Sequence, residues 1–232
     1  MTSVRDLILG RIRGALGMEE GVTSDGILPE EGETGSSIPR NYRRRGTRGP
    51  GDLLDLLQDR IVDYEATVVR CRPPELSETI SLRLGAREAM TVVLPPGIPD
   101  TWIRGVSWPG LEIARDLNPE TLDVTQLGSA HAVLTGCTLA IAETGTLVLD
   151  GGPTQGRRAL TLLPDYHLCV VFQHQVVETV PEAVESLTDT LKETRSPLTL
   201  ISGPSATSDI ELIRVEGVHG PRTLDVILVE DR

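Results

Sequence analysis

Short apolar runs alternate with helix-like segments from residue 51 to the end of the chain. The runs expected to form strands are 66–70, 90–94, 139–142, 147–149, 167–172, 198–201 and 224–229. Apolar positions at helical spacing predict helices over 52–64, 74–84, 100–105 and 180–195, with a shorter helix after Gly203. Strands that alternate with helices in this way predict an α/β fold, a three-layer, open, mainly parallel sheet with helices on both faces.

The first 50 residues follow a different pattern. Residues 3–16 carry apolar side chains at helical spacing and predict a short amphipathic helix that packs on the parent fold or on a partner. Residues 17–50 have no apolar periodicity, and an acidic half precedes an arginine-rich half. These arginines are either solvated or bind an anion or an acidic protein face. We therefore expect an N-terminal helix and flexible linker over 1–50 and one α/β domain over 51–232.

Charge and composition exclude several classes of function. A net charge of −12 weighs against a nucleic-acid surface, which needs a basic patch. Lys192 is the only lysine, which weighs against Schiff-base chemistry and against a phosphate-binding P-loop. Cys71, Cys137 and Cys169 are far apart and show no C-x-x-C spacing, so we expect no disulfide, zinc or iron–sulfur site in this chain.

The sequence also predicts where the protein resides. No apolar run approaches the roughly 18 residues that span a bilayer. The N-terminal residues lack the apolar region and cleavage site of a signal peptide. The sequence thus predicts a soluble cytoplasmic protein without membrane insertion.

One carboxylate interrupts the apolar stretch 139–149. Glu143, Thr144 and Gly145, followed by Thr146, predict a tight connection between two short buried strands. A carboxylate at a buried strand end must find hydrogen bonds or take up a proton. Two interpretations remain open. Glu143 accepts hydrogen bonds within its own turn, or it faces a cleft in which its burial suits it to acid–base catalysis.

A glycine-rich loop with two arginines follows these strands. Residues 150–158 combine several glycines with Arg157 and Arg158. Exposed backbone amides and guanidinium groups bind carboxylates and phosphates. A flexible connection with solvated arginines explains the same residues equally well. The loop lacks the G-x-G-x-x-G pattern, so a dinucleotide site is only weakly indicated.

Residues 202–210 form a further candidate loop after the strand expected over 198–201. Gly203 begins a turn, and Ser205 is a suitable N-cap for a helix whose first amides could bind an anion. Asp209 favours the alternative, because a carboxylate in the first turn already satisfies the helix dipole. The loop is therefore either an anion site or a self-capped helix start.

His219 is the preferred general acid or base among the histidines, because it lies between glycines in residues 217–222, just before the last strand. Three other histidines are interpreted as structural or exposed: His131, His167 and His174. A hydrolase triad of Ser205, His219 and Asp209 is disfavoured, because the G-x-S-x-G pattern is missing. Cys137 is interpreted as a small buried residue and not as a nucleophile.

These loops lie at or near strand ends, and in open α/β sheets the ligand usually sits beyond the carboxyl ends of the strands. We expect them to meet in one crevice without a metal. The candidate catalytic residues are Glu143 and His219. The candidate ligand-binding residues are Thr144, Gly145, Thr146, Gly203, Ser205, Asp209 and Gly220.

Four segments, taken in order, resemble one protein family. They are CTLAIAETGTLVLDGG, ALTLLPDYHLCVVFQHQVV, ISGPSATSDIEL and VEGVHGPRTLDVILVED. The resemblance is to the LUD-domain family of lactate utilization proteins, of the LutC or YkgG type, and it covers roughly residues 51–232. By position, the family's motif residues correspond to Glu143, Thr144, Gly145, Gly203, Pro204, Ser205, Asp209, His219, Gly220 and Pro221.

The resemblance implies a sheet of the kind shared by ribose-phosphate isomerases and CoA transferases. It also implies a cytoplasmic accessory subunit of a system that oxidises L-lactate to pyruvate, which binds a small anionic ligand. Partner subunits would carry the iron–sulfur clusters, and this chain would bind no cofactor itself. The alternative is a stand-alone enzyme of the CoA-transferase or sugar-phosphate isomerase type, with Glu143 as nucleophile or base.

Overall fold

The computed structural model describes Arg5 and residues 8–11, 41–117, 121–194, 196–207, 215–216 and 219–231. The chain divides into two units, residues 1–42 and 43–232. In the first unit, Arg5 and residues 8–11 are helical, and the rest of the helix expected over 3–16 lies outside the described residues.

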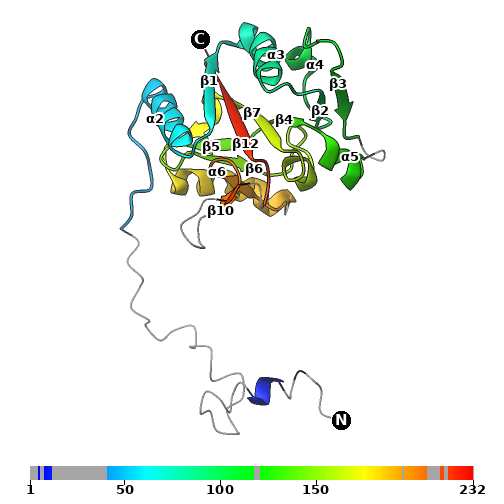
Figure 1. Cartoon of the computed structure of the whole chain (residues 1–232). Helices are drawn as coiled ribbons and strands as arrows, with labels where there is room; N and C mark the ends of the chain where they lie inside the picture. Colours follow the sequence, from blue (N-terminus) through cyan, green and yellow to red (C-terminus); the bar gives the residue numbers. More distant parts are fainter. Residues whose placement is uncertain are drawn as a thin grey trace. The chain divides into compact units, whose positions relative to one another are not determined.

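The described residues of the second unit are organised around a six-stranded sheet (Figure 1). Its strands, in spatial order, are β1 (Thr67–Cys71), β12 (Thr223–Val229), β7 (Tyr166–Phe172), β4 (Ala132–Gly136), β2 (Thr91–Leu94) and β3 (Glu112–Arg115). Every neighbouring pair is parallel. The inner strands are nearly continuous apolar runs because both faces of a parallel sheet are buried. The predicted parallel α/β sheet is confirmed.

A smaller sheet packs beside the first. It contains β8 (Val176–Val177), β5 (Leu139–Ile141), β6 (Thr146–Leu149) and β9 (Thr199–Ile201). Strands β5 and β6 form an antiparallel hairpin, so both runs of the interrupted apolar stretch are strands, as predicted. They belong to this second sheet and not to the main one. A two-stranded ribbon pairs β10 (Ala206–Thr207) with β11 (Val215–Glu216).

Helices cover both faces of the main sheet. On one face lie α3 (Leu76–Ala86), preceded by the short 3-10 turn η2 (Pro73–Glu75), and α4 (Asp100–Ile103). On the other face lie α2 (Pro50–Asp63), α5 (Val124–Ser129) and the small sheet, and α6 (Val180–Thr194) covers the outer side of that small sheet (Figure 1). Two further 3-10 turns, η3 (Arg158–Thr161) and η4 (Gln173–Gln175), flank β7. None of the described helices is long and apolar enough to cross a membrane.

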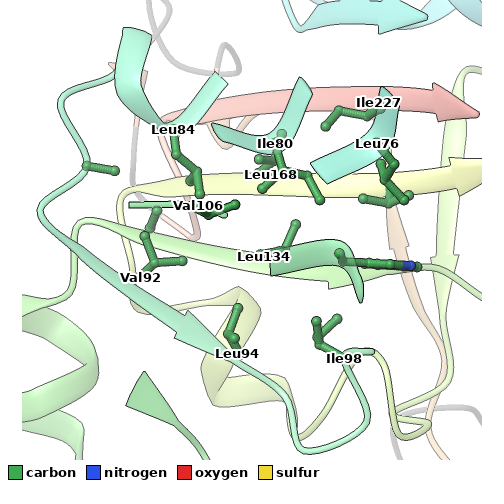
Figure 2. Close-up of a cluster of buried hydrophobic side chains, with 14 of the residues drawn as sticks. Leu76, Ile80, Leu84, Val92, Leu94, Ile98, Val106, Leu134, Leu168 and Ile227 are labelled. Carbon is green, nitrogen blue, oxygen red and sulfur yellow. The ribbon is translucent and has the colours of Figure 1, made fainter. Parts of the chain in front are cut away.

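Two apolar cores hold these layers together. In the first, Leu76, Ile80 and Leu84 project from α3 onto the sheet, where Leu168 and Ile227 receive them (Figure 2). The second core lies between the main sheet and the small sheet, and α2 contributes to it. Because the side chains of a strand alternate between faces, β7 and β12 contribute to both cores.

The carboxyl ends of β2 and β4 are closed by the glycine-rich loop 150–156. The amide of Gly97, just after β2, donates to the carbonyl of Pro153 at 2.8 Å, and the amide of Gly136 donates to the carbonyl of Thr154 at 2.9 Å. A Cβ atom on Gly97 would lie 2.5 Å from Pro153, so the two backbones are in close contact. The loop therefore covers the carboxyl ends of β2 and β4.

Candidate functional site

A pocket of about 210 Å³ lies at the amino ends of β7 and β12. Its described lining comprises Arg158, Thr161, His167, residues 200–205, residues 219–221 and Leu224. His167 and Leu224 are the second residues of β7 and β12, and they stand opposite each other in the sheet. We call this space the anion pocket, for reasons given below. The expectation of a site beyond the carboxyl ends of the strands stays a prediction, because a cavity of about 860 Å³ lies at the carboxyl ends of β1, β7 and β12, with Arg70, His174 and Glu230 in its lining.

Two loops that are distant in sequence form one wall of the anion pocket. The amide of Ser205 donates to the carbonyl of Pro221 at 2.8 Å, and the amide of His219 donates to the hydroxyl oxygen of Ser205 at 3.0 Å. Gly203 has a φ of +83°, and a Cβ atom there would lie 2.5 Å from Tyr64. Only glycine adopts this conformation readily in so little space. The sequence thus fixes how the loop passes the end of α2.

The remainder of this segment differs from the prediction. No helix begins after Gly203 in the described residues, because the chain continues into β10. Ser205 therefore does not cap a helix, and its side chain joins the two loops of the pocket instead. Asp209 lies outside the described residues.

His167 forms the floor of the anion pocket. Its side chain is buried, and its Nε2 atom is hydrogen-bonded to the hydroxyl of Thr135 on the neighbouring strand β4 at 2.7 Å. The register pairs Val133 with His167 and Thr135 with Cys169, which places the hydroxyl beside the ring. From the sequence, His167 was interpreted as structural or exposed and not as a site residue. A histidine in an otherwise apolar strand was the only available signal.

Two thiols lie in the core close to His167. Cys169 is two residues along β7, and Cys137 follows β4; both are buried. The proximity of the two thiols raises the pKa of Cys137 and lowers that of Cys169, and His167 also lowers the pKa of Cys169. Cys137 is thus a small buried residue, as its surroundings in the sequence suggested.

Arg158 begins η3 at the edge of the pocket. One of its guanidinium nitrogens donates to the carbonyl and to the hydroxyl of Thr161, both at 2.9 Å. Burial lowers the pKa of the guanidinium, but an arginine remains charged at neutral pH. Among the described residues, no carboxylate forms a salt bridge with Arg158, and it also lines an adjoining cavity of about 290 Å³.

The described lining of the anion pocket carries no negative formal charge. Its described lining includes one arginine and two imidazoles, but no aspartate or glutamate. The hydroxyls of Thr161, Ser202 and Ser205 add hydrogen-bonding groups. Guanidinium, imidazole and hydroxyl groups together are suited to a carboxylate or another small oxyanion. This composition is the reason for the name of the pocket.

The structure places Glu143 outside this lining. The corner, defined as residues 143–146, joins β5 to β6, and the carboxylate of Glu143 forms a salt bridge with Arg43. The corner is nevertheless linked to the pocket through hydroxyls. Thr144 and Thr146 are 2.7 Å apart between their hydroxyl oxygens, and Thr146 lies 2.8 Å from Ser202 in the same way. Of the predicted site residues, Gly203, Ser205, His219 and Gly220 line one pocket.

A metal site finds no support in the described part of the chain. No group of three or more histidine, cysteine, aspartate or glutamate side chains there is arranged to hold a metal ion.

Comparisons with known proteins give a consistent result. The model of the LUD domain matches residues 123–229. A protein named lactate utilization protein C from Deinococcus radiodurans is 49% identical over 178 residues, which are 77% of this chain and 80% of that protein. A protein of the same name from Bacillus velezensis is 24% identical over 219 residues, which are 88% of this chain and 90% of that protein.

A solved structure agrees with these relatives. A crystal structure of a DUF162 family protein from Deinococcus radiodurans superposes with a TM-score of 0.66 at 40% identity. The match covers 79% of this chain and 99% of the other. The chain belongs to the LUD-domain family.

Proposed function

We propose that this chain serves in lactate utilization, as an accessory subunit of a system that oxidises L-lactate to pyruvate. The names of its relatives from Deinococcus and Bacillus support the role in lactate utilization. The iron–sulfur clusters of the system would be carried by partner subunits, since the three cysteines of this chain are isolated in sequence and buried. The place of action is the cytoplasm.

The chain's own contribution is to bind a small carboxylate in the anion pocket. The observation that carries this proposal is the composition of the described lining, which has a guanidinium, two imidazoles and hydroxyls but no carboxylate. A 2-hydroxy or 2-oxo acid matches these groups. Its carboxylate pairs with Arg158. At Ser205 and His219, the hydroxyl of a 2-hydroxy acid donates or accepts a hydrogen bond, and the carbonyl oxygen of a 2-oxo acid accepts one.

His219 is the proposed proton-handling group of the pocket, because it reaches the ligand space from a loop and its amide is fixed by Ser205. Glu143 is proposed to act indirectly. Its carboxylate is paired with Arg43, and this pairing favours a binding role for the protein over chemistry at Glu143.

Isothermal titration of the purified chain with pyruvate and with L-lactate tests the binding proposal. Arg158→Gln should weaken binding by roughly tenfold or more, because a hydrogen bond to a charged group contributes about 1.5–3 kcal/mol. Arg104→Gln is the matched control, since Arg104 is exposed and lies outside the pocket lining. Equal affinities in the two variants, or no heat with either acid, would contradict the proposal.

A separate experiment tests the partner proposal. The tagged chain is purified from its native host during growth on lactate, and we expect iron–sulfur proteins to accompany it. Deletion of the gene should abolish growth on lactate. Recovery of the chain alone, together with unimpaired growth of the deletion strain, argues against an accessory subunit.

A further inference from the structure

The arginine-rich segment 43–48, which we call the strap, lies across an acidic face of the same unit. Its partners are glutamates of the corner, of the residues after β8 and of the first turns of α6: Glu143, Glu178, Glu182 and Glu185. Of the two interpretations of these arginines, solvated or bound to an acidic face, the structure supports the second for Arg43 and Arg48. The acidic face belongs to the chain itself.

Glu178 is the anchor of the strap. Its side chain is only 2% exposed, and Arg43 and Arg48 each donate a guanidinium hydrogen bond to it at 2.7 Å. The amides of Thr47 and Arg48 donate to its other oxygen at 2.7 and 2.8 Å. The amide of Arg48, the Arg43 guanidinium and the amide of Thr47 lower the pKa of Glu178 to about 2. Glu178 is therefore an ionised, buried carboxylate whose described side-chain partners all come from the strap.

The fit of the strap leaves no room for a side chain at Gly46. An ideal Cβ atom there would lie 2.3 Å from the Cβ atom of Glu178. The amide of Gly46 donates to Glu182 at 3.0 Å. An uncharged substitution at this position must therefore displace the strap.

Arg43 connects the anchor to the corner. The same guanidinium that donates to Glu178 forms the salt bridge with Glu143, and the amide of Glu143 donates to the carbonyl of Glu178 at 3.1 Å. From the corner, the hydroxyls of Thr144 and Thr146 lead to Ser202 in the pocket wall. A continuous series of hydrogen bonds and ion pairs thus runs from the strap to the anion pocket.

The corner has little freedom to move on its other side. Gly145 has a φ of +59°, and a Cβ atom there would lie 2.8 Å from the backbone of Arg60 in α2. The corner is thus fixed between α2 and the strap. Release of the strap removes one of these two supports and leaves Glu143 and Glu178 without their counter-ions.

We infer that the strap regulates the anion pocket, and that the docked strap is the state in which the pocket binds its ligand. This inference rests on the proposed function. Docked arginines neutralise Glu143 and Glu178, whereas a released strap leaves two carboxylates whose negative potential opposes an incoming anion. Release also removes one of the two supports of the corner, to which Thr146, the neighbour of Ser202, belongs. Both effects act in the same direction.

Coupling of this kind is reciprocal. If the docked strap favours the anion, the bound anion favours the docked strap by the same factor. The amides of Thr47 and Arg48 report on docking directly, because both donate to Glu178. Their hydrogen–deuterium exchange should slow when pyruvate is added to the full chain.

Three variants distinguish the effect of strap docking from the effect of removing one positive charge. Arg43→Gln removes the contacts with Glu143 and Glu178. Arg45→Gln removes the same charge from a side chain that is 77% exposed and whose ion-pair partner among the described residues is Glu185. Gly46→Ala displaces the strap without changing the charge. We expect Arg43→Gln and Gly46→Ala to speed amide exchange at Thr47 and Arg48 and to weaken pyruvate binding at least fivefold, a typical coupling factor. Arg45→Gln should resemble the unmodified chain in both measurements.

The outcomes distinguish the two proposals. If the unmodified chain does not bind pyruvate, the proposed function fails, and the exchange rates of the variants still establish whether the strap docks on Glu178. If pyruvate binds the unmodified chain and both strap variants equally well although their amides exchange faster, the regulation is refuted and the pocket stands. Unchanged exchange in Gly46→Ala refutes the docked strap itself.

Discussion

Arg157 and Arg158 are neighbours in sequence and have opposite surroundings. Arg157 donates to both oxygens of the buried Asp116, at 2.8 and 3.0 Å, and this hydrogen-bonded pair lowers the pKa of the carboxyl. Arg158 has no carboxylate partner in the described part of the chain and faces two adjoining cavities. The sequence offered the two guanidiniums as equal candidates for an anion. In the structure, Arg157 stabilises the fold through Asp116, and Arg158 lines the anion pocket.

The same contrast separates two larger regions. On the acidic face, the arginines of the strap supply partners for Glu143 and Glu178, so charge is balanced within the chain. Around the anion pocket, the described cationic and hydroxyl groups have no carboxylate among them. A charged side chain that is paired with an opposite charge of the same chain stabilises the fold or holds a segment such as the strap in place. A pocket whose described lining has a guanidinium and no carboxylate is a candidate site for an external anion.

The largest expected effect is a loss of stability when Arg157, but not Arg158, is replaced by glutamine. Arg157→Gln leaves Asp116 buried without its main partner, and we expect the free energy of unfolding to fall by about 2 kcal/mol, because hydrogen bonds to charged groups contribute about 1.5–3 kcal/mol and Arg157 is partly exposed. Arg158→Gln should change the free energy of unfolding by less than about 0.5 kcal/mol. Urea unfolding measures both variants. A destabilised Arg158→Gln with unchanged pyruvate affinity would reverse the two roles.

The contact of the loop 150–156 with the carboxyl end of β2 provides a second test, this time of a contact that stabilises the fold. Gly97→Ala places a methyl group against the backbone of Pro153, and we expect a loss of about 1–2 kcal/mol, because overpacking a close contact costs roughly 1–3 kcal/mol. Gly85→Ala in α3 is the control, because a Cβ atom there meets nothing within 4 Å and alanine favours the helix. The anion pocket lies at the opposite end, so neither change should alter pyruvate binding.

The fold class could be predicted from the sequence, because the apolar runs that indicate strands are local features of the chain. Four of the six strands of the main sheet, β1, β2, β7 and β12, coincide with predicted apolar runs, and the composition of β7 and β12 alone indicates buried parallel strands. The other two, β3 and β4, were not among the runs expected to form strands, and two of the four residues of β3 are charged. The helix expected directly after Gly203 is not formed at residues 206–207, which belong to β10, and the reason is that the signal there was not local. Serine and threonine residues near a turn suit a helix start and a strand ribbon alike, and the choice depends on pairing with residues 215–216.

Only part of the site could be predicted from the sequence. Gly203, Ser205, His219 and Gly220 were identified as a group, and they do line one pocket. His167 was missed because its role comes from the neighbouring strand, which supplies Thr135 and exposes one side of the ring to the pocket. The partners of Glu143 could not be inferred either. They lie about one hundred residues earlier, in a segment without apolar periodicity.

The smallest expected effect is a dependence on pH that only the structural arginine should show. Arg157 lowers the pKa of Asp116 in the folded state, so the pair stabilises the fold fully above the unfolded pKa of aspartate, about 3.9, and loses this contribution as the pH falls toward the lower folded value. The loss begins near the unfolded pKa and grows as the pH falls below it. The difference in unfolding free energy between the unmodified chain and Arg157→Gln should therefore shrink from pH 7 to pH 3.5, as measured by urea titrations at each pH. For Arg158→Gln, whose arginine has no carboxylate partner in the described structure, the corresponding difference should stay constant. A constant difference for Arg157→Gln would mean that its link to Asp116 does not stabilise the fold, and the contrast between the two neighbours would then rest on the pocket alone.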